Sequence, residues 1–234
     1  MKRTNSEIRK QARQALDNGN WGKGIMVTVI CALFAITYML LFYKDPDTIN
    51  NASLSEVILI KTSSILWALL CLPLQWGVSI FFLHIVRQKE VKYGNLFDGY
   101  KDFFRILFTS LLQTIYTQLW SLLLIIPGIV KAISYSMTSF VLHDHPELKY
   151  NGAIEESMRL MKGSKMKLFI LYLSFIGWAI LCMLTLGIGF FLLMPYIQAS
   201  KAAFYQDLLC IDACNSETVD ISDIPEQEVS AKEI

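Results

Sequence analysis

Residues 119–137 read LWSLLLIIPGIVKAISYSM and are apolar on both sides of the pair Pro127–Gly128. The stretch contains one charge, Lys131, which follows the pair. Because proline lacks a backbone N–H donor and glycine commonly follows helix ends, a helix is expected to end or turn here. Inside a bilayer, irregular backbone persists only at the interface or where protein or water covers it. The stretch therefore predicts a tight turn that joins two membrane helices.

The composition of the whole chain is that of a membrane protein. The 234 residues are 54% hydrophobic and 18% charged, whereas soluble domains carry about 25% charged residues. The charges cluster, and the apolar runs between the clusters approach the ~20 residues that cross a ~30 Å hydrocarbon core. The net charge of +1 favours no class of partner. The first apolar run lacks the small-residue pattern of a cleaved signal peptide, so we expect it to remain as an anchor.

These runs predict an all-α membrane protein with six transmembrane helices. The predicted spans are residues 25–43, 64–86, 106–126, 129–142, 168–186 and 190–209. The chain is accordingly divided into a cytoplasmic amphipathic basic leader (1–24), a six-helix transmembrane domain (25–209) and a tail (210–234). The tail is rich in acidic residues and poor in aromatic ones, so we expect it to be disordered and cytoplasmic.

Residues 4–18 have the pattern of an amphipathic helix. Thr4 and Glu7 have the spacing of a capping box, and a similar pair, Ser53 and Glu56, indicates a helix start ahead of the second span. The apolar face of the leader helix consists of Ile8, Ala12, Ala15 and Leu16. One interpretation is a basic helix that lies on an anionic membrane surface. The alternative is a solvated leader that only fixes the topology.

The distribution of lysine and arginine predicts the orientation. The leader through Lys23 contains six of these residues, and residues 87–105 and 143–167 contain five each. The segments expected on the opposite side contain two, Lys44 and Lys61. Cytoplasmic loops carry the excess of basic residues, so both termini are expected in the cytoplasm.

Prolines recur at similar places and suggest an internal repeat. Pro73, Pro127 and Pro195 each lie near the expected outer end of the second helix of a pair. Together with Gly128, they are the expected helix-break positions. We therefore expect three tandem helix-pair repeats in the same orientation. The alternative is that membrane helices often contain proline without being repeated.

Two lysines within or beside the spans, Lys131 and Lys201, are the candidate functional residues. Placing a lysine at the bilayer centre costs ~2.5–3.5 kcal/mol on insertion scales, so it needs a partner or a wet cavity. Each could contact an anion or a lipid head group. The alternative is that each reaches an interface along its own aliphatic stem. Asp207, near the end of the sixth predicted span, is the one acidic residue within these limits, and we expect no intramembrane Asp or Glu to pair with either lysine, which argues against a proton relay.

The remaining polar motifs predict no catalysis. His143, Asp144 and His145, with His84 at a matching helix end, form one cluster of metal-ligand types, but Pro146 follows and indicates an ordinary turn. Cys210 and Cys214 have no histidine nearby, so no metal site is predicted there. No nucleophile elbow, phosphate loop, metalloprotease or dinucleotide motif occurs. We therefore expect no enzyme, no cofactor and no nucleic-acid partner.

Several short motifs resemble a bacterial integral-membrane family known as a domain of unknown function. They are R-K-Q-A-R from Arg9, N-W-G-K from Asn20, L-L-I-I-P-G-I from Leu123, K-A-I-S-Y-S-M from Lys131, L-M-K-G from Leu160, L-S-F-I-G-W from Leu173, T-L-G-I-G from Thr185, P-Y at Pro195 and A-F-Y at Ala203. The resemblance covers residues 6–209 and implies a multi-pass protein of a bacterial cell membrane. It implies no activity, substrate or catalytic residue.

Two classes of function fit these patterns. The first is a non-catalytic membrane protein that binds lipid or protein partners, with anionic lipid expected at the basic cytoplasmic face. The second is a small transporter or channel-like protein for an anionic solute or lipid, suggested by proline-containing helices and the two lysines. Whether these lysines face a wet cavity or lipid distinguishes the two classes.

Overall fold

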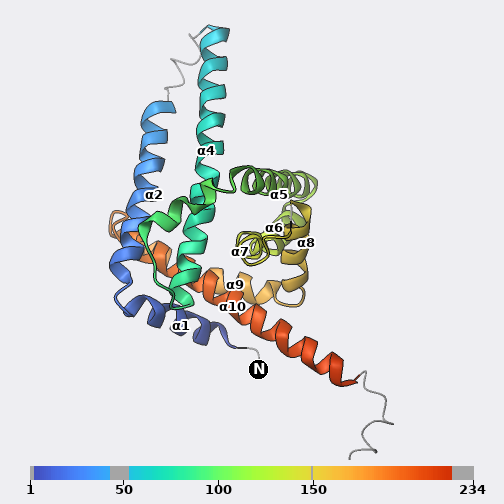
Figure 1. Ribbon diagram of the computed structural model, residues 1–234. Helices are drawn as coiled ribbons and strands as arrows, with labels where there is room; N and C mark the ends of the chain where they lie inside the picture. The colour runs from blue at the N-terminus through green and yellow to red at the C-terminus, as the bar shows by residue number, and fades with distance from the viewer. Residues whose placement is uncertain (1–2, 43–52, 149, 223–234) are drawn as a thin grey trace, which may run out of the picture.

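The computed structural model describes residues 3–42, 53–148 and 150–222, and these segments are helical throughout, apart from short connections. The elements are α1 (Asn5–Asp17), α2 (Trp21–Phe42), α4 (Leu54–Val86), the 3₁₀ helix η1 (Tyr93–Tyr100), α5 (Phe103–Leu123), α6 (Ile125–Tyr135), α7 (Thr138–Asp144), α8 (Asn151–Leu160), α9 (Lys165–Leu184) and α10 (Phe190–Ser222) (Figure 1). The described part of the chain therefore confirms the all-α class.

Five of these segments are long and apolar enough to cross a membrane. Among the described residues they are Trp21–Phe42, Leu54–Val86, Phe103–Leu123, Ile125–Asp144 and Lys165–Leu184. The fourth combines α6 and α7, so the predicted fourth span runs on beyond residue 142. The predicted sixth span, 190–209, lies within α10, which is not among the five. The structure thus agrees with a protein that crosses the membrane several times, with five candidate spans where six were predicted.

Apolar side chains at the ends of the helical hairpins are exposed in a way that suits lipid. Leu122 is 87% exposed and Ile125 is 77% exposed at the turn between α5 and α6. Leu186, in the turn between α9 and α10, is 95% exposed. An apolar surface of this extent is compatible with surrounding hydrocarbon and unfavourable in water.

The helix α10 forms the core of the protein rather than one more helix at its edge. It runs obliquely across α4 and also packs against α1, α2 and α9 (Figure 1). Its middle is buried on most sides; the fully buried apolar residues there are Ala199, Ala202, Ala203, Phe204 and Tyr205. A helix that is apolar nearly all round is a buried helix, whether lipid or protein surrounds it. In this part of α10 the surroundings are mainly protein.

The leader helix α1 has the predicted boundaries and caps. The Thr4 hydroxyl accepts a hydrogen bond from the Glu7 N–H at 3.3 Å, and the Glu7 carboxylate accepts one from the Thr4 N–H at 2.6 Å. Two contacts place α1 antiparallel beside α10, because Arg3, just before α1, lies at Asp207, and the carbonyl of Arg9 within α1 accepts a hydrogen bond from the Tyr196 hydroxyl at 3.5 Å. The apolar face of α1 is buried in the protein core. This face is therefore not available to insert into a membrane surface.

The helix break within residues 119–137 lies at Leu124, three residues before Pro127, where it was predicted. The helix α5 ends at Leu123, Leu124 has extended backbone (φ −158°, ψ 137°), and α6 starts at Ile125. Pro127 then falls in the first turn of α6, where its missing N–H would have had no partner in the helix. At Gly128 a Cβ atom would lie 2.5 Å from the Ser121 hydroxyl oxygen and 2.8 Å from the Ser121 Cα. Glycine therefore allows α5 and α6 to meet closely.

The other two prolines do not end helices. The helix α4 continues through Pro73, and α10 continues through Pro195. A proline within a helix removes one backbone hydrogen bond and favours a kink at that point. The predicted capping box at Ser53 and Glu56 is present, so α4 already starts within the stretch assigned to the outer connection.

The beginning of the predicted tail differs from expectation. The helix α10 runs to Ser222, so residues 210–222 are helical, whereas the sequence suggested that disorder starts at residue 210. The rest of the tail, residues 223–234, lies outside the described residues.

The close contact between η1 and α4 gives a first prediction. A Cβ atom at Gly77 would lie 2.0 Å from the Leu96 carbonyl oxygen, whereas one at Gly177 would meet nothing within 4 Å. Both glycines lie inside helices, where alanine is intrinsically favoured by ~1 kcal/mol. We expect Gly77→Ala to lower the free energy of unfolding by ~1–3 kcal/mol through overpacking. Gly177→Ala should leave it unchanged or raise it. Thermal unfolding in detergent measures both, and equal melting temperatures for the two variants would contradict this packing.

Candidate functional site

A polar cavity of about 250 Å³ lies where α4, α5, α7 and α10 meet. We call it the Lys201 cavity. Its lining residues are Leu72, Gln75, Trp76, Ser79, Ser110, Gln113, Thr114, Ser136, Ser139, Gln198 and Lys201. Most of these residues lie within apolar runs that the sequence assigned to membrane spans. Polar side chains are costly there unless they bind one another, water or a ligand.

Lys201 carries the single charge among the described lining residues, which include no Asp or Glu. Its ammonium nitrogen lies 5.5 Å from the centroid of the Phe140 ring, a favourable cation–π distance. No described acidic side chain forms a salt bridge with it. The cavity therefore holds a positive charge for which the described residues supply no counter-ion.

The polar side chains around this charge fall into two groups. Three hydroxyls are used within their own helices; Ser79, Thr114 and Ser136 donate to carbonyls at 3.3, 2.8 and 2.7 Å. A second group makes no side-chain hydrogen bond with any other described residue. It consists of Gln75, Ser110, Gln113, Ser139 and Gln198.

This second group determines what the cavity can bind. Each glutamine offers two N–H donors and each serine one O–H donor. Together with an ammonium group, such donors suit a negatively charged group, because hydrogen bonds to ions are stronger than those between neutral partners. The arrangement therefore has the chemistry of an anion-binding site.

The second candidate residue, Lys131, has a different environment. Its ammonium nitrogen lies 4.8 Å from the centroid of the Trp120 ring and 4.0 Å from the Met158 sulfur. It does not line the Lys201 cavity. The structure thus separates two lysines that the sequence treated as equivalent.

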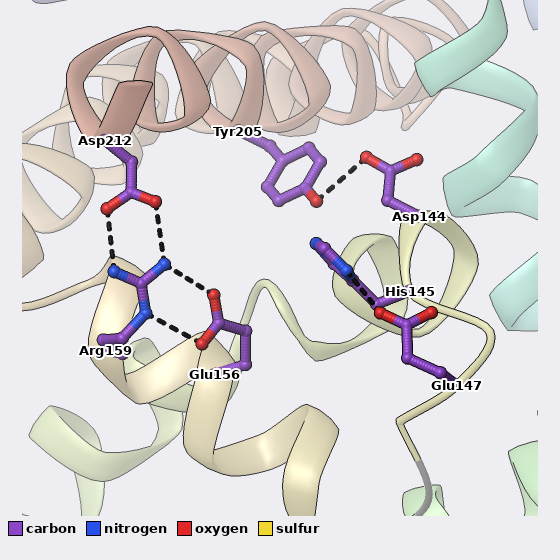
Figure 2. Close-up of polar contacts among 7 residues, drawn as sticks. All are labelled: Asp144, His145, Glu147, Glu156, Arg159, Tyr205 and Asp212. Atoms are coloured by element: carbon purple, nitrogen blue, oxygen red, sulfur yellow. Dashed lines mark hydrogen bonds and ion pairs between the residues drawn. The ribbon is translucent and has the colours of Figure 1, made fainter. Parts of the chain in front are cut away.

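A network of ion pairs next to the cavity fastens α10 to its neighbours. Arg87, at the end of α4, donates to both carboxylate oxygens of Asp144 at 2.7 and 2.5 Å. The Tyr205 hydroxyl of α10 donates to the same carboxylate at 3.0 Å (Figure 2). With its amide oriented to satisfy both groups, Gln206 also accepts from Arg87, at 2.7 and 2.9 Å. The side chains of Arg87 and Asp144 are only 20% and 17% exposed, so this pair lies largely within the protein.

Two further pairs hold α10 farther along its length. Lys167 lies 2.6 Å from Asp207, whose side chain is 3% exposed. Arg159 of α8 binds both Glu156 and Asp212, each through two short hydrogen bonds (Figure 2). Hydrogen bonds from the Arg159 guanidinium lower the pKa of Glu156 and that of Asp212 below their ordinary values.

The histidine cluster noted in the sequence is divided among three partners. His143 Nε2 lies 3.4 Å from His84 Nε2, and Asp144 pairs with Arg87. His145 Nδ1 lies 2.8 Å from the Glu147 carboxylate, as Figure 2 shows. Among the described residues, no group of three or more His, Cys, Asp or Glu side chains is placed to hold a metal ion.

Lys201 was identifiable from the sequence, but the residues that surround it were missed. The signal was available in the glutamines at positions 75, 113 and 198, which interrupt strongly apolar runs. Glutamine in a membrane segment requires a hydrogen-bonding partner, so these positions could have been considered together. Nothing in the linear order shows that they face one cavity, because they belong to three helices.

From the Arg87–Asp144 pair we predict that substitutions at these two positions have strongly coupled effects on the free energy of unfolding. Arg87→Met leaves a buried carboxylate without its partner and should cost about 3 kcal/mol of unfolding free energy. Asp144→Asn leaves the guanidinium unpaired and should cost a similar amount. In the double variant neither charge remains, and the asparagine introduced at position 144 can still accept a hydrogen bond from Tyr205. We expect the double variant to be more stable than the sum of the single losses predicts, as a double-mutant cycle of unfolding in detergent would measure. Additive losses would show that the pair contributes nothing.

From the Arg159 contacts we predict that the stability of the folded protein depends on pH. Since the carboxyl pKa values are lowered in the folded protein, these contacts stabilise it fully above the ordinary values of 4.5 and 3.8. Their contribution is lost as the pH falls through the lowered values. Arg159 is 54% exposed, so the contribution should be only ~0.2–1 kcal/mol. Arg159→Gln should be less stable than the parent at neutral pH and converge with it in acid. A constant difference in melting temperature across this range would contradict the assignment.

Comparison with known proteins identifies the family. The family model described as "Protein of unknown function (DUF975)" matches residues 1–134 and 122–211. These segments cover most of the chain and include every residue that lines the Lys201 cavity. The comparisons with curated proteins and with solved structures gave no match. The chain belongs to the DUF975 family, a family of unknown function.

Proposed function

We propose that the protein is a non-catalytic integral membrane protein that binds an anionic group in the Lys201 cavity. One observation carries the proposal: the Lys201 ammonium faces a polar cavity whose described lining contains no acidic side chain. The uncommitted amide and hydroxyl groups around it supply the further donors that an anion needs.

The energetics of burial support this proposal. A charged group enclosed by protein without a counter-ion costs several kcal/mol after relaxation. Packing does not require such a group, because a methionine of similar length would fill the same space without this cost. A residue that lowers stability while presenting a charge to a cavity is typical of a binding site.

Transport of an anionic solute is the second candidate function. It is favoured by the position of the prolines, because Pro73 precedes Gln75 by two residues and Pro195 precedes Gln198 by three. Transporters commonly place their binding residues beside irregular helix positions that allow movement. Uptake of a radiolabelled anion into proteoliposomes would distinguish transport from binding alone.

The placement in the membrane is part of the same proposal. The strong excess of lysine and arginine on one side supports a cell-membrane protein with both termini in the cytoplasm. Two hairpins also share a spacing: Gly128 meets Ser121 and Gly189 meets Cys182, each across seven residues. This match supports a tandem repeat for the second and third helix pairs. The corresponding turn of the first pair falls in residues 43–52, outside the described residues.

The proposal is tested by comparing the two lysines. In lipid nanodiscs, Lys201→Gln should bind butyl phosphate at least about tenfold more weakly than the parent, ~1.4 kcal/mol, because a charged hydrogen bond is lost. Lys131→Gln, the matched control, should bind as the parent does. Isothermal titration calorimetry measures both affinities.

A stability measurement accompanies this test and excludes a folding defect. Lys201→Gln should melt at the same temperature as the parent or higher, because it removes an uncompensated charge. Equal binding by the parent and Lys201→Gln, or equal losses in both lysine variants, would overturn the proposed site.

A further inference from the structure

A second hollow, the α2–α4 groove, has a volume of about 560 Å³ and lies beside the Lys201 cavity. Its walls are mainly apolar and aromatic, and no charged side chain is among the described residues that form them. The lining residues are Cys31, Phe34, Ala35, Tyr38, Trp67, Ala68, Cys71, Leu72, Leu74, Gln75, Val78 and Gln198. A hollow of this size and lining is typical of a site for a small apolar ligand.

The groove and the cavity share part of their lining. Leu72, Gln75 and Gln198 line both. Each of these side chains therefore separates a polar space on one side from an apolar space on the other. The amides of Gln75 and Gln198 make no hydrogen bond with other described residues, so no such bond holds this boundary closed.

We propose that the ligand of the Lys201 cavity is an amphiphile with an anionic head group and an alkyl chain, and that the chain occupies the α2–α4 groove. This inference rests on the proposed function and specifies its ligand class. The head group would bind Lys201, and the chain would leave the cavity between Gln75 and Gln198.

Because a polar cavity adjoins an apolar groove, an amphiphile fits the combined site better than a small soluble anion does. A soluble anion would use only the donors of the cavity and would make no use of the adjoining apolar groove. A chain in the groove packs against apolar and aromatic walls, and because it arrives from bilayer hydrocarbon, its contribution comes from this packing rather than from transfer out of water. An uncharged lipid would fill the groove but leave the Lys201 ammonium unpaired. A chain with an anionic end satisfies both parts.

Two native cysteines allow a direct test, because Cys31 and Cys71 both line the groove. The protein in nanodiscs would be treated with N-ethylmaleimide, and the modification rate of each cysteine measured by peptide mass spectrometry. Dodecyl phosphate at ten times its dissociation constant should slow the reaction of both about tenfold, the factor by which the free form is depleted. Cys210, which is exposed on α10 and outside the groove, should react at an unchanged rate.

Matched probes and variants isolate the head group and the chain. Dodecanol has the same chain without the charge and should give at most about twofold protection at the same concentration, because the affinity lost with the charge is at least about tenfold. Dodecyl phosphate should protect Lys201→Gln at most about twofold, because a tenfold weaker affinity leaves half of the sites free at the same concentration. Ala68→Phe, which fills the groove, should weaken the binding of dodecyl phosphate and leave that of butyl phosphate unchanged. Together these results would establish one site that binds both parts of the ligand.

Other results would overturn the inference in distinguishable ways. If dodecanol protected the cysteines as well as dodecyl phosphate does, alkyl chains would enter the groove without the charge. The same conclusion would follow if dodecyl phosphate protected Lys201→Gln as well as the parent. Binding of butyl phosphate that depends on Lys201, with no protection by dodecyl phosphate, would refute the amphiphile and leave the proposed function intact. If no phosphate bound in a Lys201-dependent way, both proposals would fail together.

Discussion

The structure depends on how the polar side chains of one buried helix, α10, are paired. Tyr205 and Gln206 meet the Arg87–Asp144 pair, Asp207 meets Lys167, and Asp212 meets Arg159. These contacts connect α10 to α4, α7, α8 and α9. Buried polar groups are costly when they lack partners, so these pairs favour one position and one rotation of the helix. Lys201, on the same helix, has no acidic partner among the described residues, and its charge marks the candidate site.

The parts of the fold that depend on neighbouring residues were predictable from the sequence. The capping boxes at Thr4 and Ser53 form as expected, because the hydrogen bonds join residues only three positions apart. The apolar face of α1 was also correct, but the sequence could not show that α10 covers it. A run such as 190–209 is equally apolar whether lipid or protein surrounds it, so hydropathy could not show that protein covers the middle of α10. Proline gave a similar ambiguity, since Pro127 lies at a helix start and Pro73 lies within a helix.

The candidate site was only partly predictable for a related reason. The cost of a charge in an apolar segment identifies Lys201 from the sequence alone. The residues that surround it come from separate helices, so their convergence is a property of the tertiary structure. The adjoining α2–α4 groove shares Gln75 and Gln198 with the cavity, and this contact of polar and apolar spaces gives the ligand its proposed amphiphilic character. The same packing that holds α10 in place thus positions the cation at the boundary.

The proposal that the Lys201 cavity holds an anion would be tested most directly by cryo-electron microscopy of the protein in nanodiscs with butyl phosphate. We expect density for the phosphate group at hydrogen-bonding distance, ~2.7–3.2 Å, from the Lys201 ammonium nitrogen. We also expect Gln75 or Gln198 to turn its amide nitrogen towards that density. A cavity that contains only water, or a phosphate that binds elsewhere while Lys201 points to lipid, would contradict the proposed site.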